Sequence, residues 1–415
     1  MKLLYFCPHQ IWPANTGARL RDYELARQLA ARASVTFVQM CRAGEEPCTL
    51  PDDSGLAAVV TLDKDRTYTP FKVLRGLAGP TPMTVLNCWS LRARSQLASV
   101  LHSGQFDTIQ MEGVHLLKYL PVIMEAPRSP AVVVDWHNIE SELMWRYAEN
   151  TSNWAKKTAA RRTAKLIERA EDRILKMCGT HTVTSERERQ KLLARCPEAN
   201  IHVIPNGVDT NAYTAKKIAE SGSGTGQANS NPTILFIGSM DYHANIDAAT
   251  WFSRQVWPEI SRAHPELVFT IIGRNPSPEV RRLASDRIRV TGTVDDIRPF
   301  FASAAAVIVP IRYGSGTRYK ILEAMAAGVP VVSTRLGAEG IEAKDCVHFL
   351  LADNGTEFAA AVSRLLTSPD TRSGFSKAAR ALMSRIYDWP IIGTRLYGIH
   401  SELAAKRISS LGMTS

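Results

Sequence analysis

The chain has 415 residues, 45% of them apolar and 22% charged, and this composition is typical of folded proteins rather than disordered ones. Its length exceeds that of an ordinary single domain, so we expect two domains. The net charge of +10 favours anionic ligands, and seven scattered cysteines without C-x-x-C spacing exclude a disulfide framework and indicate no zinc site.

The first residues, MKLLYFCPHQIWP, predict a buried strand. They carry one cation and a short apolar run broken by Pro8, which does not match a secretory signal peptide. No stretch of the chain reaches the roughly 20 apolar residues that a membrane-spanning helix needs. We therefore expect a cytoplasmic protein, either soluble or peripheral at the inner face of the cell membrane.

Short β-branched runs alternate with longer segments of helical period along the chain. Examples are SVTFVQM, AVVVDW, TILFIGS and AAAVIVPI, with helical segments such as ARLRDYELARQLAARA between them. This pattern predicts α/β architecture, with parallel sheets covered by helices on both faces. We expect two Rossmann-like doubly wound domains, at residues 1–205 and 206–383. A helix within residues 384–415 should pack back on the first domain.

The second domain should contain a linker or surface loop near its start. Residues 219–233, AESGSGTGQANSNPT, are rich in Gly, Ser and Asn and almost free of apolar side chains.

Two stretches of the first domain are candidates for chemistry. PANTGARLR follows the first strand and opens a helix, so Gly17 can bring backbone N–H groups toward an anion, although Arg19 could be a solvated charge. AVVVDWHNIESE puts Asp135 and His137 at the end of a buried strand. His137 is either a structural hydrogen-bonding residue or an active-site residue, and with Asp135 it offers too few ligands for a metal site.

The segment 154–177 predicts a long helix with eight Lys or Arg residues against three acidic ones. Such a run is either a solvated face or a surface that attaches to anionic lipid.

In the second domain, a glycine-rich loop lies between a strand, AAAVIVPI, and a helix, RYKILEAMAA, that ends before Gly328. Gly314 and Gly316 allow close approach of the backbone to a ligand, and Arg318 and Lys320 add positive charge at the helix start. These features predict an anion cradle that suits a diphosphate. The alternative is a tight turn whose cations are solvated. Glu323, in the same first turns, could hydrogen-bond ribose hydroxyls.

The sequence GSGTRYKILEAMAAGVPVVST resembles the donor domain of the retaining glycosyltransferases of family 4, which have the GT-B fold, two domains facing across a cleft. The resemblance extends upstream through VIPNGVD, LFIGSMDYHANIDAATWF, FTIIGRNPSPEV and VTGTVDDIRPFFASAAAVIVP, and the first half matches more loosely. It implies a metal-independent and cofactor-free hexosyltransferase that retains anomeric configuration. The donor would be a UDP- or GDP-type sugar, and the acceptor a glycan, lipid-linked oligosaccharide or other glycoconjugate, in surface polysaccharide biosynthesis.

The resemblance also implies roles for individual residues. Glu323 should hold the ribose, and His137 should orient the donor sugar near C6, with general-base action as a less secure alternative. Two positions that bind the diphosphate through Arg and Lys in many relatives are Ser239 and Asn245 here, and we expect Arg318 and Lys320 to supply that charge. The remaining donor-binding candidates are Gly17, Gly238, Gly273, Arg274, Val294, Gly314, Ser315, Gly316 and Thr317.

Ser315 departs from the family pattern, because relatives have a glutamate there that contacts the donor sugar. This departure and Ser239 keep two alternatives open, a non-catalytic nucleotide-sugar-binding protein and a GT-B sugar-nucleotide epimerase. Nucleic-acid binding is not expected, because the basic residues show no interleaving with aromatics and no reader helix.

Overall fold

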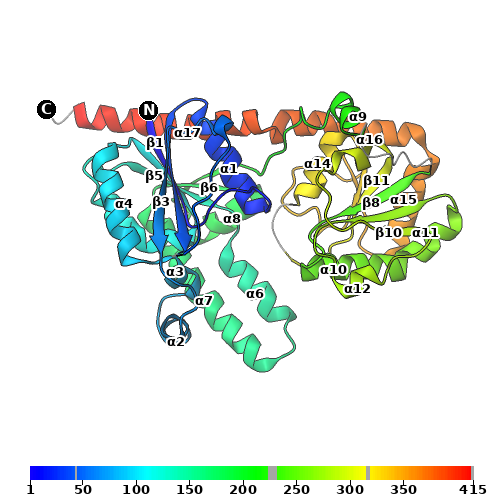
Figure 1. Ribbon diagram of the computed structural model, residues 1–415, viewed down its shortest axis with the longest axis horizontal. Helices are drawn as coiled ribbons and strands as arrows, with labels where there is room; N and C mark the ends of the chain where they lie inside the picture. The colour runs from blue at the N-terminus through cyan, green and yellow to red at the C-terminus, as the bar shows by residue number, and fades with distance from the viewer. Residues whose placement is uncertain (43, 223–230, 315–317, 413–415) are drawn as a thin grey trace. The chain divides into compact units, whose positions relative to one another are not determined.

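The computed structural model describes residues 1–42, 44–222, 231–314 and 318–412 (Figure 1). The chain forms two compact units. Unit 1 contains residues 1–205 together with the segment from Trp389 onward, and unit 2 contains residues 206–388. The chain therefore passes twice between the units.

Unit 1 is built on a parallel sheet with the strand order β3-β2-β1-β4-β5-β6-β7. Its strands are β1 Lys2–Cys7, β2 Ser34–Arg42, β3 Ala58–Lys64, β4 Thr108–Glu112, β5 Ala131–Trp136, β6 Thr180–Val183 and β7 Asn200–Val203. Residues 3–7 of β1 are all buried, which explains the continuous apolar run in the sequence, because helices cover both faces of a parallel sheet.

The helices of unit 1 alternate with these strands, as the periodicity predicts. They are α1 Gly17–Ala30, α2 Pro70–Ala78, α3 Met83–Cys88, α4 Leu91–Gly104, α5 Leu120–Met124, α6 Glu140–Asn150, α7 Trp154–Met177 and α8 Glu186–Arg195. Leu4 and Phe6 of β1 share one core cluster with Leu97 and Leu101 of α4.

The last helix, α17 (Trp389–Gly412), belongs to unit 1 although it follows unit 2 in the chain. Its buried His400 hydrogen-bonds Thr108 Oγ1 and Gln110 Oε1, both at 2.9 Å. Gly393 lies so close to α1 that a Cβ there would meet Gln28 Cβ at 2.4 Å. The helix expected within residues 384–415 therefore begins at Trp389, and residues 383–387 continue the preceding helix of unit 2 as a π-helical turn.

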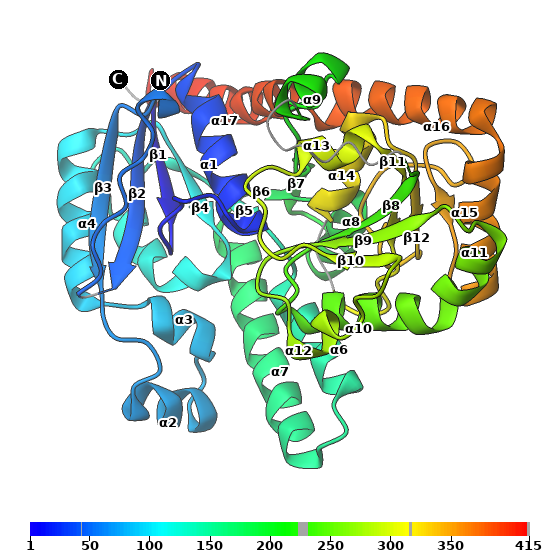
Figure 2. The same cartoon turned by 45° about the vertical axis from the view of Figure 1, so that its right-hand side comes forward.

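Unit 2 has a second parallel sheet, with the order β10-β9-β8-β11-β12-β13 (Figure 2). Its strands are β8 Thr233–Ile237, β9 Val268–Ile272, β10 Ile288–Val290, β11 Ala304–Val309, β12 Val331–Ser333 and β13 Leu350–Leu351. Its helices are α9 Ala215–Gly222, α10 His243–Trp251, α11 Trp257–Ala263, α12 Pro278–Arg281, α13 Arg298–Ala302, α14 Tyr319–Ala327, α15 Gly355–Thr367 and α16 Pro369–Leu382.

The expected linker at 219–233 is shorter than the composition suggests. Residues 219–222 complete α9, and Thr233 begins β8. Residues 223–230 lie outside the described part of the chain.

Both sheets reverse their direction of winding at a central pair of strands. In unit 1 the pair is β1 and β4, and in unit 2 it is β8 and β11. Ligands of open α/β sheets bind beyond the carboxyl ends of the strands at such a switch point. We therefore expect a ligand-binding site among the residues that follow these four strands.

Candidate active site

The loop between β11 and α14 contains the glycine-rich stretch. Gly314 has φ +112°, a conformation that side chains disfavour, and a Cβ there would lie 3.2 Å from Arg318 Nη2. Arg318 caps α14, and Gly328 ends the helix in the left-handed conformation. Ser315, Gly316 and Thr317 lie outside the described residues.

Lys320, in the first turn of α14, reaches the end of β8. Its ammonium donates a hydrogen bond to Asn245 Oδ1 at 3.0 Å, and Asn245 Nδ2 donates to the Ser239 carbonyl at 2.9 Å. The ammonium also lies 4.5 Å from the centre of the Phe236 ring. Lys320 thus brings a positive charge to Asn245, one of the two positions where many family members have a cation and this chain does not.

The other position, Ser239, is contacted by a different cation. Arg274 follows β9, and its Nε donates to Ser239 Oγ at 2.7 Å. Sequence reasoning assigned the compensating charge to Arg318 and Lys320 and gave Arg274 no link to Ser239. The contact depends on β8 and β9 being neighbours, which the linear pattern does not state.

Gly238 and Gly273 pack against each other at the ends of β8 and β9. A Cβ on Gly273 would lie 1.6 Å from the Gly238 carbonyl oxygen, and a Cβ on Gly238 would lie 2.8 Å from Lys320 Nζ. Position 273 therefore requires glycine, because an added Cβ would meet backbone, and Gly238 leaves the space that the Lys320 ammonium occupies.

Burial changes the titration of Lys320. Desolvation first, and then repulsion from Arg318, lower the pKa of Lys320 to about 7, while Glu323 opposes the shift. An anion that reached this ammonium would favour its charged form.

Glu323 is partly buried on α14 and accepts a hydrogen bond from Tyr213 at 3.2 Å. Burial raises the pKa of the Glu323 carboxyl, and the Tyr213 hydroxyl and Lys320 act against this rise. The carboxylate thus shares one end of the helix with the two cations Arg318 and Lys320.

A cavity of about 440 Å³ lies beside this edge, between the segments that follow β9 and β10. It is lined by Asn275, Pro276, Arg281, Ala284, Val290, Thr291, Gly292 and Thr293. Val294, one of the donor-binding candidates, lines a separate cavity of about 410 Å³ with Leu235, Thr270 and Phe300.

In unit 1, His137 follows β5 and lies among three carboxylates. Its Nε2 is 3.2 Å from Asp22 Oδ1 and 3.3 Å from Asp135 Oδ2, and its Nδ1 is 3.5 Å from Glu112 Oε1. Burial alone would lower the pKa of His137, but Asp22 and Glu112 raise it well above its usual value.

Asp135 has a structural partner. Arg21, which is 1% exposed, donates from Nε and Nη2 to the two oxygens of Asp135 at 2.9 and 2.8 Å. Thr182 adds a third hydrogen bond at 2.7 Å. Burial favours the neutral acid, but Arg21 holds the pKa of Asp135 well below its usual range. Both oxygens of Asp135 are thus occupied.

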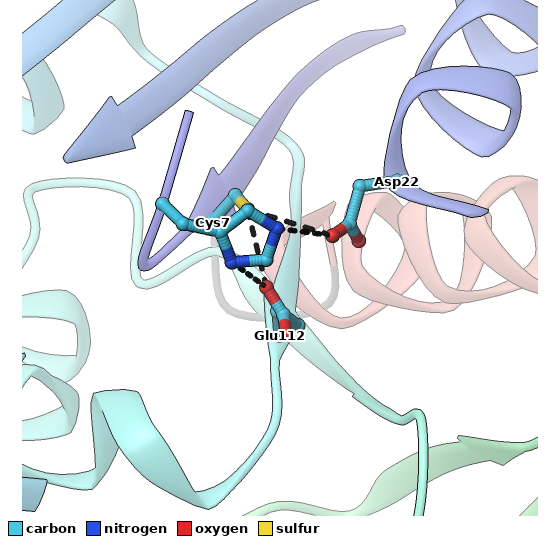
Figure 3. A group of neighbouring side chains, drawn as sticks. Cys7, Asp22 and Glu112 are labelled. Carbon is cyan, nitrogen blue, oxygen red and sulfur yellow. Dashed lines mark hydrogen bonds and ion pairs between the residues drawn. The ribbon is translucent and has the colours of Figure 1, made fainter. Parts of the chain in front are cut away.

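Sequence reasoning missed four further side chains around His137. Cys7 ends β1, His9 follows it, Asp22 lies on α1 and Glu112 ends β4. Figure 3 shows Cys7, Asp22 and Glu112 converging from these three elements. The available signal was the position of Cys7 and Glu112 at the ends of buried strands, where the residues that bind ligands in α/β sheets lie.

Gly17 is exposed and is the first residue of α1. Thr16 caps the helix by accepting from the Arg19 N–H at 3.4 Å. The glycine thus lies at a helix N-terminus, as expected.

Two family models match the chain. The model described as Glycosyltransferase Family 4 matches residues 17–212, and the one described as Glycosyl transferases group 1 matches residues 231–368. The chain belongs to the family 4 glycosyltransferases. This finding confirms the family resemblance drawn from the sequence.

Curated relatives agree with this assignment. The chain is 28% identical over 214 residues to phosphatidyl-myo-inositol mannosyltransferase of Mycobacterium leprae, covering 48% of this chain and 53% of the relative. It is 23% identical over 346 residues to alpha-D-kanosaminyltransferase of Streptomyces kanamyceticus, covering 76% and 81%. The chain spans about half the length of the first relatives that it matches.

Solved structures of glycosyltransferases share the fold. Sucrose-phosphate synthase from Thermosynechococcus elongatus superposes with a TM-score of 0.73 at 17% identity, covering 98% of this chain and all of that one. HepE from Anabaena in complex with UDP superposes with a TM-score of 0.67 at 18% identity, covering 97% and 100%. These likenesses confirm the predicted GT-B fold with its two α/β domains. Within the described ranges of the glycosyltransferase, no helix combines the length and apolarity needed to cross a bilayer.

Proposed function

We propose that this glycosyltransferase moves a hexose, with retention of configuration, from a UDP- or GDP-type sugar to a hydroxyl of a glycoconjugate. The observation that carries the proposal is the grouping of Lys320, Arg274 and the N-terminus of α14 at the carboxyl edge of the unit 2 sheet. HepE, which shares the fold, has been crystallised with UDP and with UDP-glucose, and this supports a nucleotide-sugar donor.

The chemistry of transfer explains why cations belong at this edge. As the bond between the sugar and the diphosphate breaks, negative charge grows on the leaving phosphate and the sugar acquires oxocarbenium character. Positive groups fixed before the reaction lower that barrier. In our proposal Lys320 and Arg274 neutralise the leaving diphosphate, assisted by Arg318 and the helix N–H groups. No metal ion is required at the diphosphate.

We assign the rest of the donor to the surroundings of this cluster. Glu323 would exchange its hydrogen bond with Tyr213 for one from a ribose hydroxyl. The cavity lined by Pro276, Thr291 and Gly292 would hold the base, at a volume of about 440 Å³. His137 and Gly17 belong to unit 1, and their roles in orienting the sugar and binding the diphosphate stay predictions from the family resemblance.

We propose a lipid-linked acceptor at an anionic membrane surface. Figures 1 and 2 show α2 and the α6–α7 hairpin projecting from the same end of unit 1. They expose apolar side chains, with Phe71 66%, Leu74 64% and Trp154 79% accessible. Arg162 of the basic helix α7 donates to the carbonyls of Gly76 and Gly79 at the end of α2, which ties the two segments together.

Vesicle sedimentation tests this part of the proposal. Wild-type protein should bind phosphatidylglycerol vesicles and leave phosphatidylcholine vesicles unbound, because apolar insertion here needs charge attraction as well. The Phe71→Ser/Leu74→Ser double variant should lose most of this binding. Leu91→Ser is the matched control, because Leu91 is 70% exposed on another helix. Equal binding to both lipids would refute the requirement for an anionic surface, and no loss in the double variant would refute docking through α2.

Incubation with a panel of UDP- and GDP-sugars tests the donor assignment. Slow hydrolysis of one member, with release of its nucleotide, is the expected result for a transferase without acceptor. Tight binding of several sugars without any turnover, in the absence and presence of acceptor glycolipids, would favour the non-catalytic alternative.

A further inference from the structure

Four potential metal ligands meet at the switch point of the unit 1 sheet. They are Cys7 Sγ, a ring nitrogen of His9, and one carboxylate oxygen each from Asp22 and Glu112, and all four atoms lie within 4.8 Å of one another. They come from the end of β1, from α1 and from the end of β4 (Figure 3). The edge of the sheet thus gathers residues that are distant in the sequence.

The separations between these atoms are close to the edges of a tetrahedral zinc site, and two of them are slightly shorter. Cys7 Sγ lies 3.1 Å from Glu112 Oε2 and 3.6 Å from Asp22 Oδ2. The His9 ring spans the two carboxylates, with Nε2 3.2 Å from Asp22 Oδ2 and Nδ1 3.5 Å from Glu112 Oε2, and one of these two nitrogens would bind the ion. Tetrahedral zinc, with bonds of about 2.0 to 2.3 Å, gives edges of roughly 3.3 to 3.7 Å.

The two carboxylates divide their oxygens between two sets of partners. Asp22 Oδ2 and Glu112 Oε2 face Cys7 and His9, whereas Asp22 Oδ1 and Glu112 Oε1 face His137. Asp22 Oδ1 also accepts a hydrogen bond from Tyr5 at 2.8 Å. Carboxylates that ligate a metal through one oxygen are held in this way by outer hydrogen-bonding partners on the other.

His9 supplies an independent observation. Its Nε2 is buried and makes no hydrogen bond of acceptable geometry, although it lies 3.2 Å from Asp22 Oδ2. A buried polar atom normally has a hydrogen-bond partner. A metal bound at this nitrogen would satisfy it.

We propose that Cys7, His9, Asp22 and Glu112 bind one divalent transition-metal ion of the zinc class. A thiolate and an imidazole beside two carboxylates suit zinc, whereas magnesium and calcium prefer oxygen ligands alone. Asp135 is not part of the site, because Arg21 engages both of its oxygens.

Four protein ligands make a closed site, which stabilises structure and does not bind substrate. The ion would join β1 to α1 and β4, and through Asp22 and Glu112 it would fix the ring of His137. The proposal is independent of the donor assignment, because it concerns unit 1 alone. This metal site could not be predicted from C-x-x-C spacing, because its ligands come from separate elements of the fold.

A proton-only network is the competing explanation. In it, His9 and His137 are both cationic and neutralise Asp22 and Glu112, and Cys7 stays a thiol. The two accounts differ in one respect that can be measured, because only the metal site converts Cys7 to a thiolate ligand.

The test uses the full chain after dialysis against a chelator. Titration with Zn²⁺ should show about one ion bound per chain, and Co²⁺ in its place should produce a thiolate-to-cobalt charge-transfer band. Cys7→Ser should abolish the band, and His9→Ala should weaken metal binding about tenfold or more. Cys178→Ser, a change at a buried cysteine outside the cluster, should leave both unchanged.

Absence of Zn²⁺ uptake and of the cobalt band in the folded wild-type protein would overturn the proposal. So would metal binding by His9→Ala and Cys7→Ser that equals the wild type. If Cys7→Ser does not fold, the wild-type cobalt band and its weakening in His9→Ala decide the question, because the His9 side chain is 30% exposed and its removal is tolerable.

Discussion

The two sheets carry different charged groups at equivalent edges. Arg274, Arg318 and Lys320 lie beyond β8 and β9 of unit 2. The pKa of Lys320 falls to about 7 through burial and repulsion from Arg318. Beyond β1, β4 and β5 of unit 1, carboxylates gather, and the pKa of His137 rises because Asp22 and Glu112 outweigh its burial. The fold supplies the edge in both units, and the side chains decide what each edge can bind.

Removing the Lys320 ammonium at the edge of the unit 2 sheet should have the largest effect on turnover. Lys320→Ala should lower turnover about 100- to 1,000-fold, the usual loss when one fixed group that stabilises developing negative charge is deleted. Steady-state nucleotide release from the preferred sugar nucleotide measures it. Lys377→Ala, at an exposed lysine of the same unit, is the control and should behave as wild type. Turnover of Lys320→Ala within twofold of wild type would end the charge assignment.

Breaking the buried Arg21–Asp135 ion pair of unit 1 should lower the stability of the protein. Asp135→Asn leaves Arg21 buried with its charge uncompensated, and we expect a loss of about 3 kcal/mol in the free energy of unfolding. Asp63→Asn, which disrupts a pair with the 75% exposed Arg92, should cost less than about 1 kcal/mol. Urea denaturation of the three proteins compares them. Similar midpoints for all three would show that the Arg21–Asp135 pair contributes nothing.

Low pH should weaken the same Arg21–Asp135 ion pair. The pKa of Asp135 is lowered in the folded protein, so its contribution is present above the unfolded value of about 3.9 and is lost as the pH falls through the folded value. The stability difference between wild type and Asp135→Asn should therefore shrink in strong acid. A difference that grows below pH 4 would contradict this sign.

A smaller loss of turnover is expected when Gly238, at the end of β8 in unit 2, is replaced by alanine. Gly238→Ala puts a Cβ 2.7 Å from Asn245 Nδ2 and 2.8 Å from Lys320 Nζ, so both side chains should move and turnover should fall about tenfold while unit 2 stays folded. Gly374→Ala is the matched control, because no atom lies within 4 Å of its added Cβ. Turnover and circular dichroism measure the two effects separately. Wild-type turnover in Gly238→Ala would mean that the position of Lys320 is unimportant.

The fold could be predicted from the sequence because its signal is local and repeated. Alternating β-branched runs and helical periods predict parallel α/β sheets. The loop glycines and Gly328 mark the two ends of α14, which places Arg318 and Lys320 at its start. The contact of Arg274 with Ser239 could not be predicted, because it depends on strand order. The same holds for Asp22, a residue of α1 that meets Glu112 at the end of β4 only when β1 and β4 pair.

Proton uptake on UDP binding tests the central claim, that the Lys320 ammonium binds the leaving diphosphate. At pH 8 a lysine with a pKa of about 7 is mostly neutral, and contact with the diphosphate should recharge it. Isothermal titration calorimetry in buffers of different ionisation enthalpy should therefore show uptake of close to one proton by wild-type protein and none by Lys320→Ala, with affinity falling as the pH rises above 7. Binding of UDP by the wild type without proton uptake, or equal uptake by Lys320→Ala, would contradict the account.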